Sequence, residues 1–293
     1  MSGTVVVTID PKTAGERLRK DLEGSGYEPH RNPNARWAFR GPGVVISFYA
    51  SGKLVAQGKG AADFAATWLP GVDSGPRMET LDEDLIGTDE SGKGDYFGPL
   101  VAAAVCIPAG QEAVLAELGV RDSKEMTDAS AARAAAAIRA GYAHEVVTIG
   151  PERYNELYEE FENLNYMLAW ATAKAVKGVT DEHPCRNVLS DKFGNERLIA
   201  NALVKAGVEV SLTQRTKAEI NPAVAAASIV ARAEFLSHLA ALGKACGTKL
   251  PKGAGSPVLS VARRLYQDGG KDALRRVAKL HFKTTATITQ ELF

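Results

Sequence analysis

The stretch IGTDESGKGDYFGPLVAAAV, at positions 86–105, constrains the fold more than any other part of the sequence. It begins with apolar residues, turns acidic at Asp89 and Glu90, continues through a glycine-rich segment and becomes apolar again after Pro99. This pattern predicts a strand, a polar turn and a second strand. Two adjacent carboxylates at the end of a buried strand are unfavourable unless something positive lies between them, because an unpaired buried charge is costly.

A divalent metal ion is the natural partner for this acidic pair. The candidate ligands are oxygen atoms, with no His or Cys nearby in the sequence, which favours Mg²⁺ or Mn²⁺ over zinc. Gly92 and Gly94 lack a Cβ atom, so the backbone there can approach the hydroxyl or phosphate groups of a substrate. The plainer alternative for the dipeptide alone is a solvated hairpin end.

A phosphate-binding loop is a further alternative for the same residues. The segment GTDESGK at positions 87–93 fits the start of the pattern G-x-x-x-x-G-K-[ST]. The next position is Gly94, which offers no hydroxyl to Mg²⁺, and two acids inside the loop would repel phosphates. A nucleoside triphosphatase is therefore disfavoured.

Length and composition indicate a globular protein with two domains or one large domain. The chain has 293 residues, of which 45% are hydrophobic and 24% charged, and its formal net charge is zero. No apolar run approaches the roughly 20 residues that span a bilayer, and the N-terminus lacks a signal-peptide pattern. We therefore expect a cytoplasmic protein without a membrane partner. Cys106, Cys185 and Cys246 are widely spaced and odd in number, which favours reduced core thiols over disulfides or a zinc site.

Charge is segregated along the chain although its total is zero. Residues 73–84 are acidic, whereas residues 244–283 are rich in lysine and arginine. A solvated helix face is the default explanation for such a basic segment, and a surface for a phosphate backbone is the alternative.

Residues 1–70 predict a small α+β module. We expect strands and helices from the alternation of apolar residues and the turn signals, with strands at 4–9, 36–40, 44–50 and 53–58 and helices after Asp10 and at 61–69. Both helices would cover one face of the sheet. The open face could then be lined by Arg36, Arg40, Phe48 and Lys53 as a nucleic-acid platform, with core packing as the alternative for the aromatic residue. Residues 71–84 are the expected linker.

Residues 85–293 predict an α/β domain. Besides the first two strands we expect strands at 144–149, 188–193 and 209–214, and helices at 112–118, 128–141, 151–160, 165–176, 195–206, 222–242, 258–267 and 272–280. Residues 121–124 form a polar loop or a helix cap. Asp191 and Glu219 fall at or just beyond strand ends, the edge at which open α/β sheets build their sites.

Four motifs in a fixed order carry a family resemblance: GTDESGKGDYFGPLVAAAV, RDSKEMT, NVLSDKF and RTKAEINPAVAAASIVAR. Together they resemble the type 2 ribonuclease H family. The Asp-Tyr-Phe-Gly-Pro segment after the glycine turn and the extra N-terminal module resemble its ribonuclease HIII branch. The match covers nearly the whole chain.

The resemblance implies an RNase H-like fold, with a five-stranded mixed sheet flanked by helices and an N-terminal module similar to one repeat of the TATA-binding protein. It implies an endonuclease that cleaves the RNA strand of RNA–DNA hybrids with Mg²⁺ or Mn²⁺ and leaves 5′-phosphate and 3′-hydroxyl ends. The expected partner is the hybrid duplex, and no obligate protein partner is indicated.

By motif, Asp89, Glu90 and Asp191 match three acids that bind metal and catalyse in the family. Glu219 falls where the fourth acid lies, which is Asp in many relatives, so this position departs from the pattern. Our hypothesis is that Asp89 bridges two divalent ions, that Glu90 and Asp191 each hold one of them, and that Glu219 orients the ion that carries the attacking water.

Further residues match substrate-binding positions of the family. Ser91, Gly92, Lys93 and Gly94 form a turn that resembles the element that contacts RNA 2′-hydroxyls, and Lys217 and Ser228 are candidates for phosphate contacts. A hybrid-binding protein without catalysis is the alternative from another class. The clustered acids disfavour it, because a protein that only binds polyanions gains nothing from clustered negative charge without metal.

Overall fold

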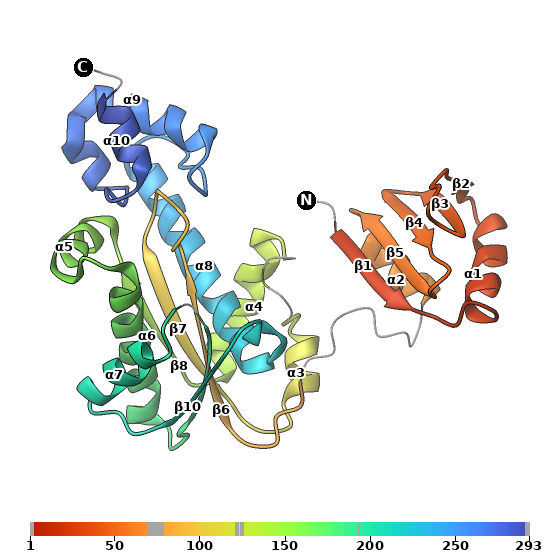
Figure 1. Cartoon of the computed structure of the whole chain (residues 1–293), viewed down its shortest axis with the longest axis horizontal. Coiled ribbons are helices and arrows are strands. Elements are labelled where there is room, and N and C mark those ends of the chain that lie inside the picture. The colour runs from red at the N-terminus through yellow and green to blue at the C-terminus, as the bar shows by residue number, and fades with distance from the viewer. Residues whose placement is uncertain (1–2, 70–78, 121–122, 124–125, 193, 291–293) are drawn as a thin grey trace. The chain divides into compact units, whose positions relative to one another are not determined.

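The computed structural model describes residues 3–69, 79–120, 123, 126–192 and 194–290. The chain divides into two compact units, residues 1–77 and 78–293, which are described separately below (Figure 1). Most of the expected polar loop at 121–124, and residues 71–78 of the expected linker, lie outside the described residues.

The N-terminal unit is an antiparallel sheet with strand order β1-β5-β4-β3-β2 and two helices. Its elements are β1 (Gly3–Thr8), α1 (Ala14–Glu23), β2 (Glu28–Pro29), β3 (Trp37–Gly41), β4 (Val44–Phe48), β5 (Lys53–Gly58) and α2 (Ala61–Trp68). Side chains from both helices share one core with alternate residues of the strands, so the helices cover one face. Only β2 was not predicted, because an edge strand of two residues shows no periodicity.

The predicted open face of this sheet is partly wrong. Phe48 is fully buried in the core, where it stacks on Trp37 with 4.9 Å between ring centroids. Arg36 pairs with Glu16 of α1 at 3.2 Å. Strand alternation explains Phe48, since Val44 and Ile46 of the same strand are also buried in that core. Arg40 and Lys53 are exposed, as expected.

The C-terminal unit is a mixed five-stranded sheet with strand order β10-β9-β6-β7-β8, flanked by helices, which confirms the expected fold class. Its strands are β6 (Leu85–Ser91), β7 (Leu100–Ile107), β8 (His144–Ile149), β9 (Asn187–Asp191) and β10 (Ser211–Arg215). β6 pairs antiparallel with β7 and parallel with β9, and β9 pairs parallel with β10.

Helices cover both faces of this sheet (Figure 1). They are α3 (Glu112–Glu117), α4 (Asp128–Gly141), α5 (Pro151–Phe161), α6 (Leu164–Glu182), α7 (Arg197–Lys205), the 3₁₀ helix η2 (Ala218–Ile220), α8 (Pro222–Ala245), α9 (Ser256–Arg275) and α10 (Lys283–Gln290). Alternation along β7 places Ala103 and Val105 against α4 and α8, and Ala104 and Cys106 against α6 and α7. The three cysteines are free, and Cys106 and Cys185 are buried as predicted, whereas Cys246 is half-buried.

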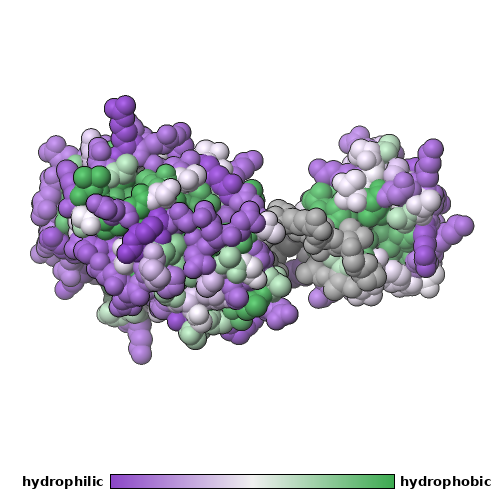
Figure 2. Space-filling model, turned by 90° about the horizontal axis from the view of Figure 1, so that it is seen from below, coloured by the Kyte–Doolittle hydropathy of each residue, from purple (hydrophilic) through white to green (hydrophobic). Residues whose placement is uncertain are grey.

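Helix α8 lies directly on β6. A Cβ atom at Gly87 would stand 2.1 Å from the carbonyl carbon of Ala223, so the two backbones touch there. By length and composition α8 is long and apolar enough to cross a membrane, with a mean hydropathy of 1.3, although Arg232 and Glu234 interrupt its apolar residues. However, 56% of that window is buried inside the unit, so α8 is its central core helix. Figure 2 shows a mainly hydrophilic face over this unit, with smaller apolar patches.

The last predicted helix, at 272–280, begins correctly after a break in the helix but extends too far. α9 ends at Arg275, after a kink at Gly269 and Gly270, and the chain then passes Lys279 in a non-helical conformation. α10 was missed because its sequence, KTTATITQ, is rich in β-branched residues with lower helix propensity.

Candidate active site

The ends of three parallel strands bring the predicted acids together. The parallel register pairs Thr88 with Ser190, so Asp89 and Asp191 follow at the same edge of the sheet. After β10 the chain enters η2, which carries Glu219. The backbone N–H of Ala218 donates to Asp191 Oδ1 at 3.2 Å and ties this segment to β9.

The four predicted acids, Asp89, Glu90, Asp191 and Glu219, line one cavity of about 400 Å³. Two predicted substrate residues line it as well, Ser91 and Ser228, and so do residues that were not predicted: Asp95, Ser123, Val224, Arg232, Phe235, Leu236 and Lys252. No three His, Cys, Asp or Glu side chains in the described ranges form a ready set of metal ligands.

The electrostatics of the cavity favour a cation. Burial, and next the negative charge of Glu90, raise the pKa of Asp89 to about 7. The Ser228 hydroxyl and the Glu90 backbone N–H, which donates to Asp89 Oδ1 at 2.8 Å, oppose this rise. Burial also raises the pKa of Glu90, and the ammonium of Lys93, 3.6 Å away, opposes it. The possible ligands are all oxygen atoms, and their carboxyl groups are costly to ionise in this buried place unless a cation is bound. Such a site fits a hard divalent ion such as Mg²⁺ or Mn²⁺.

The raised pKa of Asp89 predicts how the stability of the metal-free protein depends on pH. In the unfolded chain this carboxyl titrates near pH ~4, so between about pH 4 and pH 7 the native state binds more protons. The free energy of unfolding should therefore fall as pH rises through this window. Asp89→Asn avoids that cost, and we expect it to gain about 2 kcal/mol or more at pH ~8 in a chelator.

Urea unfolding of the wild-type protein and of Asp89→Asn, at the acidic and the alkaline end of this pH range, measures the gain in stability. It should shrink toward the acidic end, where Asp89 is neutral in both states. Asp82→Asn is the matched control, because Asp82 is exposed. Equal stability of wild type and Asp89→Asn in alkaline chelator would contradict the assigned pKa.

The glycine turn flanks the cavity without lining it. Gly92 has a φ of +88°, and a Cβ atom there would stand 2.2 Å from the carbonyl oxygen of Pro99, so only glycine fits. A Cβ atom at Gly94 would meet nothing within 4 Å, which leaves this backbone open to a ligand. Lys93 pairs with Glu90, and Lys217 is exposed at the start of η2, outside the lining.

A buried lysine, Lys279, binds the backbone that follows the glycine turn. Lys279 is fully buried, and its Nζ donates to the carbonyl oxygens of Asp95 at 2.8 Å and Gly98 at 2.7 Å. Burial lowers its pKa to about 7. The Asp95 carboxylate accepts from the backbone N–H of Gly253 at 2.6 Å. The sequence argument assigned Lys279 to a basic surface, although its apolar neighbours Val277, Ala278 and Leu280 indicate a core position.

Lys279→Met should destabilise the C-terminal unit. The substitution removes both donors and leaves two carbonyl groups in the core without their partner, so the free energy of unfolding should fall by about 3 kcal/mol. Thermal unfolding measures the loss, and Lys271→Met, at an exposed position of α9, should change little. An unchanged melting temperature for Lys279→Met would show that these bonds do not support the turn.

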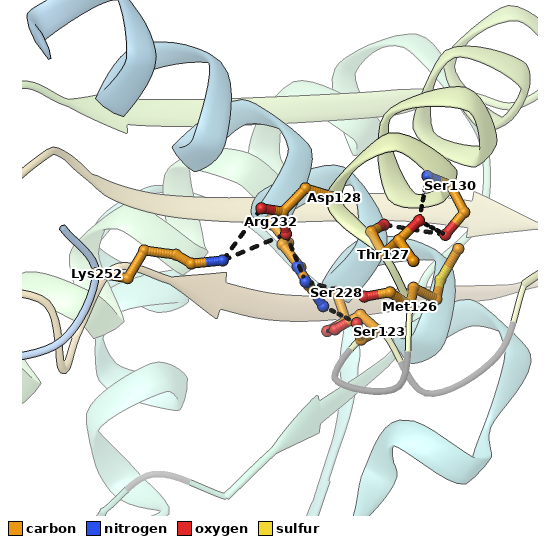
Figure 3. Close-up of polar contacts among 8 residues, drawn as sticks. All are labelled: Ser123, Met126, Thr127, Asp128, Ser130, Ser228, Arg232 and Lys252. Atoms are coloured by element: carbon orange, nitrogen blue, oxygen red, sulfur yellow. Dashed lines mark hydrogen bonds and ion pairs between the residues drawn. The ribbon is translucent and has the colours of Figure 1, made fainter. Parts of the chain in front are cut away.

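Two cations stand at the rim of the cavity and share one acid (Figure 3). Arg232 pairs with Asp128 at 2.8 Å and donates to the carbonyl oxygens of Ser123 and of Met126, and Lys252 reaches Asp128 at 3.2 Å. The hydroxyls of Ser123 and Ser228 lie 2.9 Å apart. The sequence argument missed Arg232 because no local pattern distinguishes it from other helix-surface arginines.

The mixed sheet and the acids at its adjacent strand ends define the class of RNase H-like nucleases. Comparison with known proteins specifies the family. Residues 86–285 match the family model of Ribonuclease HII, and residues 4–77 match a domain of unknown function, DUF3378. The Ribonuclease HIII of Protochlamydia amoebophila is 39% identical over 289 residues, covering 97% of this chain and 96% of the relative. The chain therefore belongs to the type 2 ribonuclease H family and, within it, to the ribonucleases HIII.

Solved structures agree with this assignment. Bst-RNase HIII, solved in complex with Mn²⁺, is 32% identical with a TM-score of 0.69, and the match covers 98% of both chains. Aquifex aeolicus RNase H3 is 31% identical with a TM-score of 0.57, covering 94% of this chain and 98% of that one. The chain is thus a ribonuclease H endonuclease. The similarity of the N-terminal unit to the TATA-binding protein stays a prediction.

Proposed function

We propose that this protein cleaves the RNA strand of RNA–DNA hybrids with Mg²⁺ or Mn²⁺ and leaves 5′-phosphate and 3′-hydroxyl ends. The observation that carries the proposal is the single cavity lined by Asp89, Glu90, Asp191 and Glu219 at the edge of an RNase H-like sheet. The Mn²⁺ complex of Bst-RNase HIII supports the choice of cofactor.

The four acids are the residues that would hold the metal. Two bound divalent ions supply a nucleophilic water and neutralise charge on the phosphate and the departing oxygen. The chain's own groups orient the acids. The Glu90 N–H and the Ser228 hydroxyl hold Asp89, and the Ala218 N–H holds Asp191. Arg232 and Lys252 at the rim add positive charge where a phosphate backbone would pass.

Selectivity for the RNA strand requires contacts that duplex DNA cannot offer, because phosphate contacts carry no such information. The 2′-hydroxyl is the distinguishing group. The backbone from Gly92 to Gly94 lies one residue beyond Glu90 along the chain, and the open space at Gly94 lets that backbone approach a ribose. We assign the selection of the cleaved strand to this turn.

The N-terminal unit is assigned to duplex binding. Its helix-free face exposes Arg40 and Lys53, and Val6 of β1 is 44% exposed. Basic and apolar side chains on one sheet face suit a duplex groove and its phosphates. The proposed place of action is the cytoplasm, which the three free cysteines support.

The test uses a hybrid labelled in turn on each strand, incubated with the full chain and Mn²⁺. Only the RNA strand should shorten, and its internal products should carry a 5′-phosphate that phosphatase removes and a 3′-hydroxyl that a polymerase extends. Cleavage of the DNA strand, or products with 5′-hydroxyl ends, would refute the proposed reaction.

A further inference from the structure

Glu79 contacts the segment that carries Glu219. Its carboxylate forms an ion pair with the guanidinium of Arg215, and the Asn221 side chain donates to the same carboxylate oxygen at 3.2 Å. Its backbone N–H donates to the carbonyl oxygen of Ile220 at 3.2 Å. These contacts join Glu79 to residues on both sides of Glu219.

The residues that Glu79 contacts are the two ends of a short arch. Arg215 is the last residue of β10, and Asn221 caps the N-terminus of α8, where its side chain accepts from the Ala223 N–H at 3.0 Å. Glu219 lies between them in η2. One carboxylate therefore connects the end of a strand to the start of the central helix, and the arch between them presents Glu219 to the cavity.

The strength of this link comes from its hydrogen bonds more than from its charge. The side chains of Arg215 and Glu79 are 38% and 31% exposed, so solvent screens much of the attraction between them. The Arg215 Nε atom, in contrast, is buried and has no hydrogen-bond partner within the described residues. The guanidinium is held through its Nη2 atom, which donates to Glu79. The hydrogen bond from Arg215 keeps the pKa of Glu79 below its usual value, so Glu79 is ionised at neutral pH.

We propose that Glu79 is a positioning residue that fixes the 215–221 segment and thereby sets the place of Glu219 at the cavity. The inference rests on the proposed function, in which Glu219 helps to hold the metal. Glu79 lies in the stretch that the sequence analysis assigned to a linker, so this part of the stretch supports the active site. A partner that orients a metal ligand typically contributes tenfold to a hundredfold in metal affinity or activity.

The test compares Glu79→Ala, Glu79→Gln and Glu83→Ala in the full chain. Glu83 is an exposed acid of the same stretch and serves as the control. Glu79→Ala should lower kcat about tenfold and weaken Mn²⁺ binding, measured calorimetrically without substrate, by a similar factor. KM for the hybrid should change less than about twofold. Glu79→Gln keeps the size and one acceptor oxygen, so its loss should be smaller.

A second comparison separates positioning from a general structural role. In a Glu219→Ala background, Glu79→Ala should cause no further loss of Mn²⁺ affinity, because the residue it positions is gone. Equal losses in both backgrounds, or a Glu79→Ala enzyme that matches Glu83→Ala, would overturn the proposal. If wild type binds Mn²⁺ but leaves hybrids uncut, the proposed function fails while the calorimetric comparison still decides the role of Glu79.

Discussion

Asp89→Asn should lower kcat for cleavage of the hybrid by at least about a thousandfold. Asp89 lies in the cavity beside Glu90 and opposite Asp191 in the sheet, and burial raises its pKa to about 7. Asparagine has nearly the same shape and can still accept the Glu90 N–H, but it cannot offer the negative charge that a divalent ion requires. The loss should therefore appear in the chemical step.

Affinity for the hybrid should stay within about threefold in this variant, because the glycine turn and the rim cations are unaffected. Single-turnover cleavage at saturating enzyme measures the rate, and a gel-shift titration measures binding. Asp82→Asn, at an exposed acid, should behave as wild type. An Asp89→Asn enzyme that keeps its activity at saturating metal would refute the assignment.

Removing residues 1–77 should weaken hybrid binding by about tenfold or more and leave kcat within about threefold. The N-terminal unit has its own core, and the four acids belong to the C-terminal unit, so the expected contribution of the N-terminal unit is affinity. Dissociation constants and single-turnover rates of the full chain and of a chain beginning at Met78 measure the two effects. An unchanged dissociation constant would remove the binding role of the N-terminal unit.

The residue at which the truncated chain begins affects the result of this experiment. Leu81 is only 6% exposed and belongs to the core of the C-terminal unit, where its backbone bonds to Glu112 and to Gly110. A chain that begins at Leu85 loses these contacts as well as Glu79. Such a chain should lose stability and kcat together, which provides a matched contrast to the chain that begins at Met78.

The helices and strands whose own residues show a clear sequence pattern were predicted with the correct bounds. The bounds of α4 and β8 agree with the structure, because α4 is rich in alanine, β8 is rich in β-branched residues, and Gly141 separates the two. The segment after α9 was wrong because Lys279 is fixed by carbonyl oxygens more than 180 positions earlier in the chain. Phe48 was placed on the wrong face because it was grouped with the basic residues by type, although alternation along β4 groups it with Val44 and Ile46.

Some residues of the candidate site could also be predicted from the sequence, and others could not. The four acids could be predicted because they lie in three distinct motifs at or just beyond strand ends, with Asp89 and Glu90 in the same motif, and the structure brings them to one cavity. Glu79 could not be predicted, because its contacts with Arg215 and Asn221 join residues 136 and 142 positions apart. Arg232 likewise acts on residues of a loop more than 100 positions earlier. Such contacts depend on the folded sheet and leave no trace in a local pattern.

The most direct test of the central claim is a parallel cleavage assay on four labelled substrates: an RNA–DNA hybrid, an RNA duplex, a DNA duplex and a single RNA strand. Purified full chain is assayed with Mg²⁺, with Mn²⁺ and with a chelator. We expect cleavage of the RNA strand of the hybrid alone, with either metal and not with the chelator. A chain that binds the hybrid tightly but leaves it intact with both metals would contradict the account and indicate a binding protein.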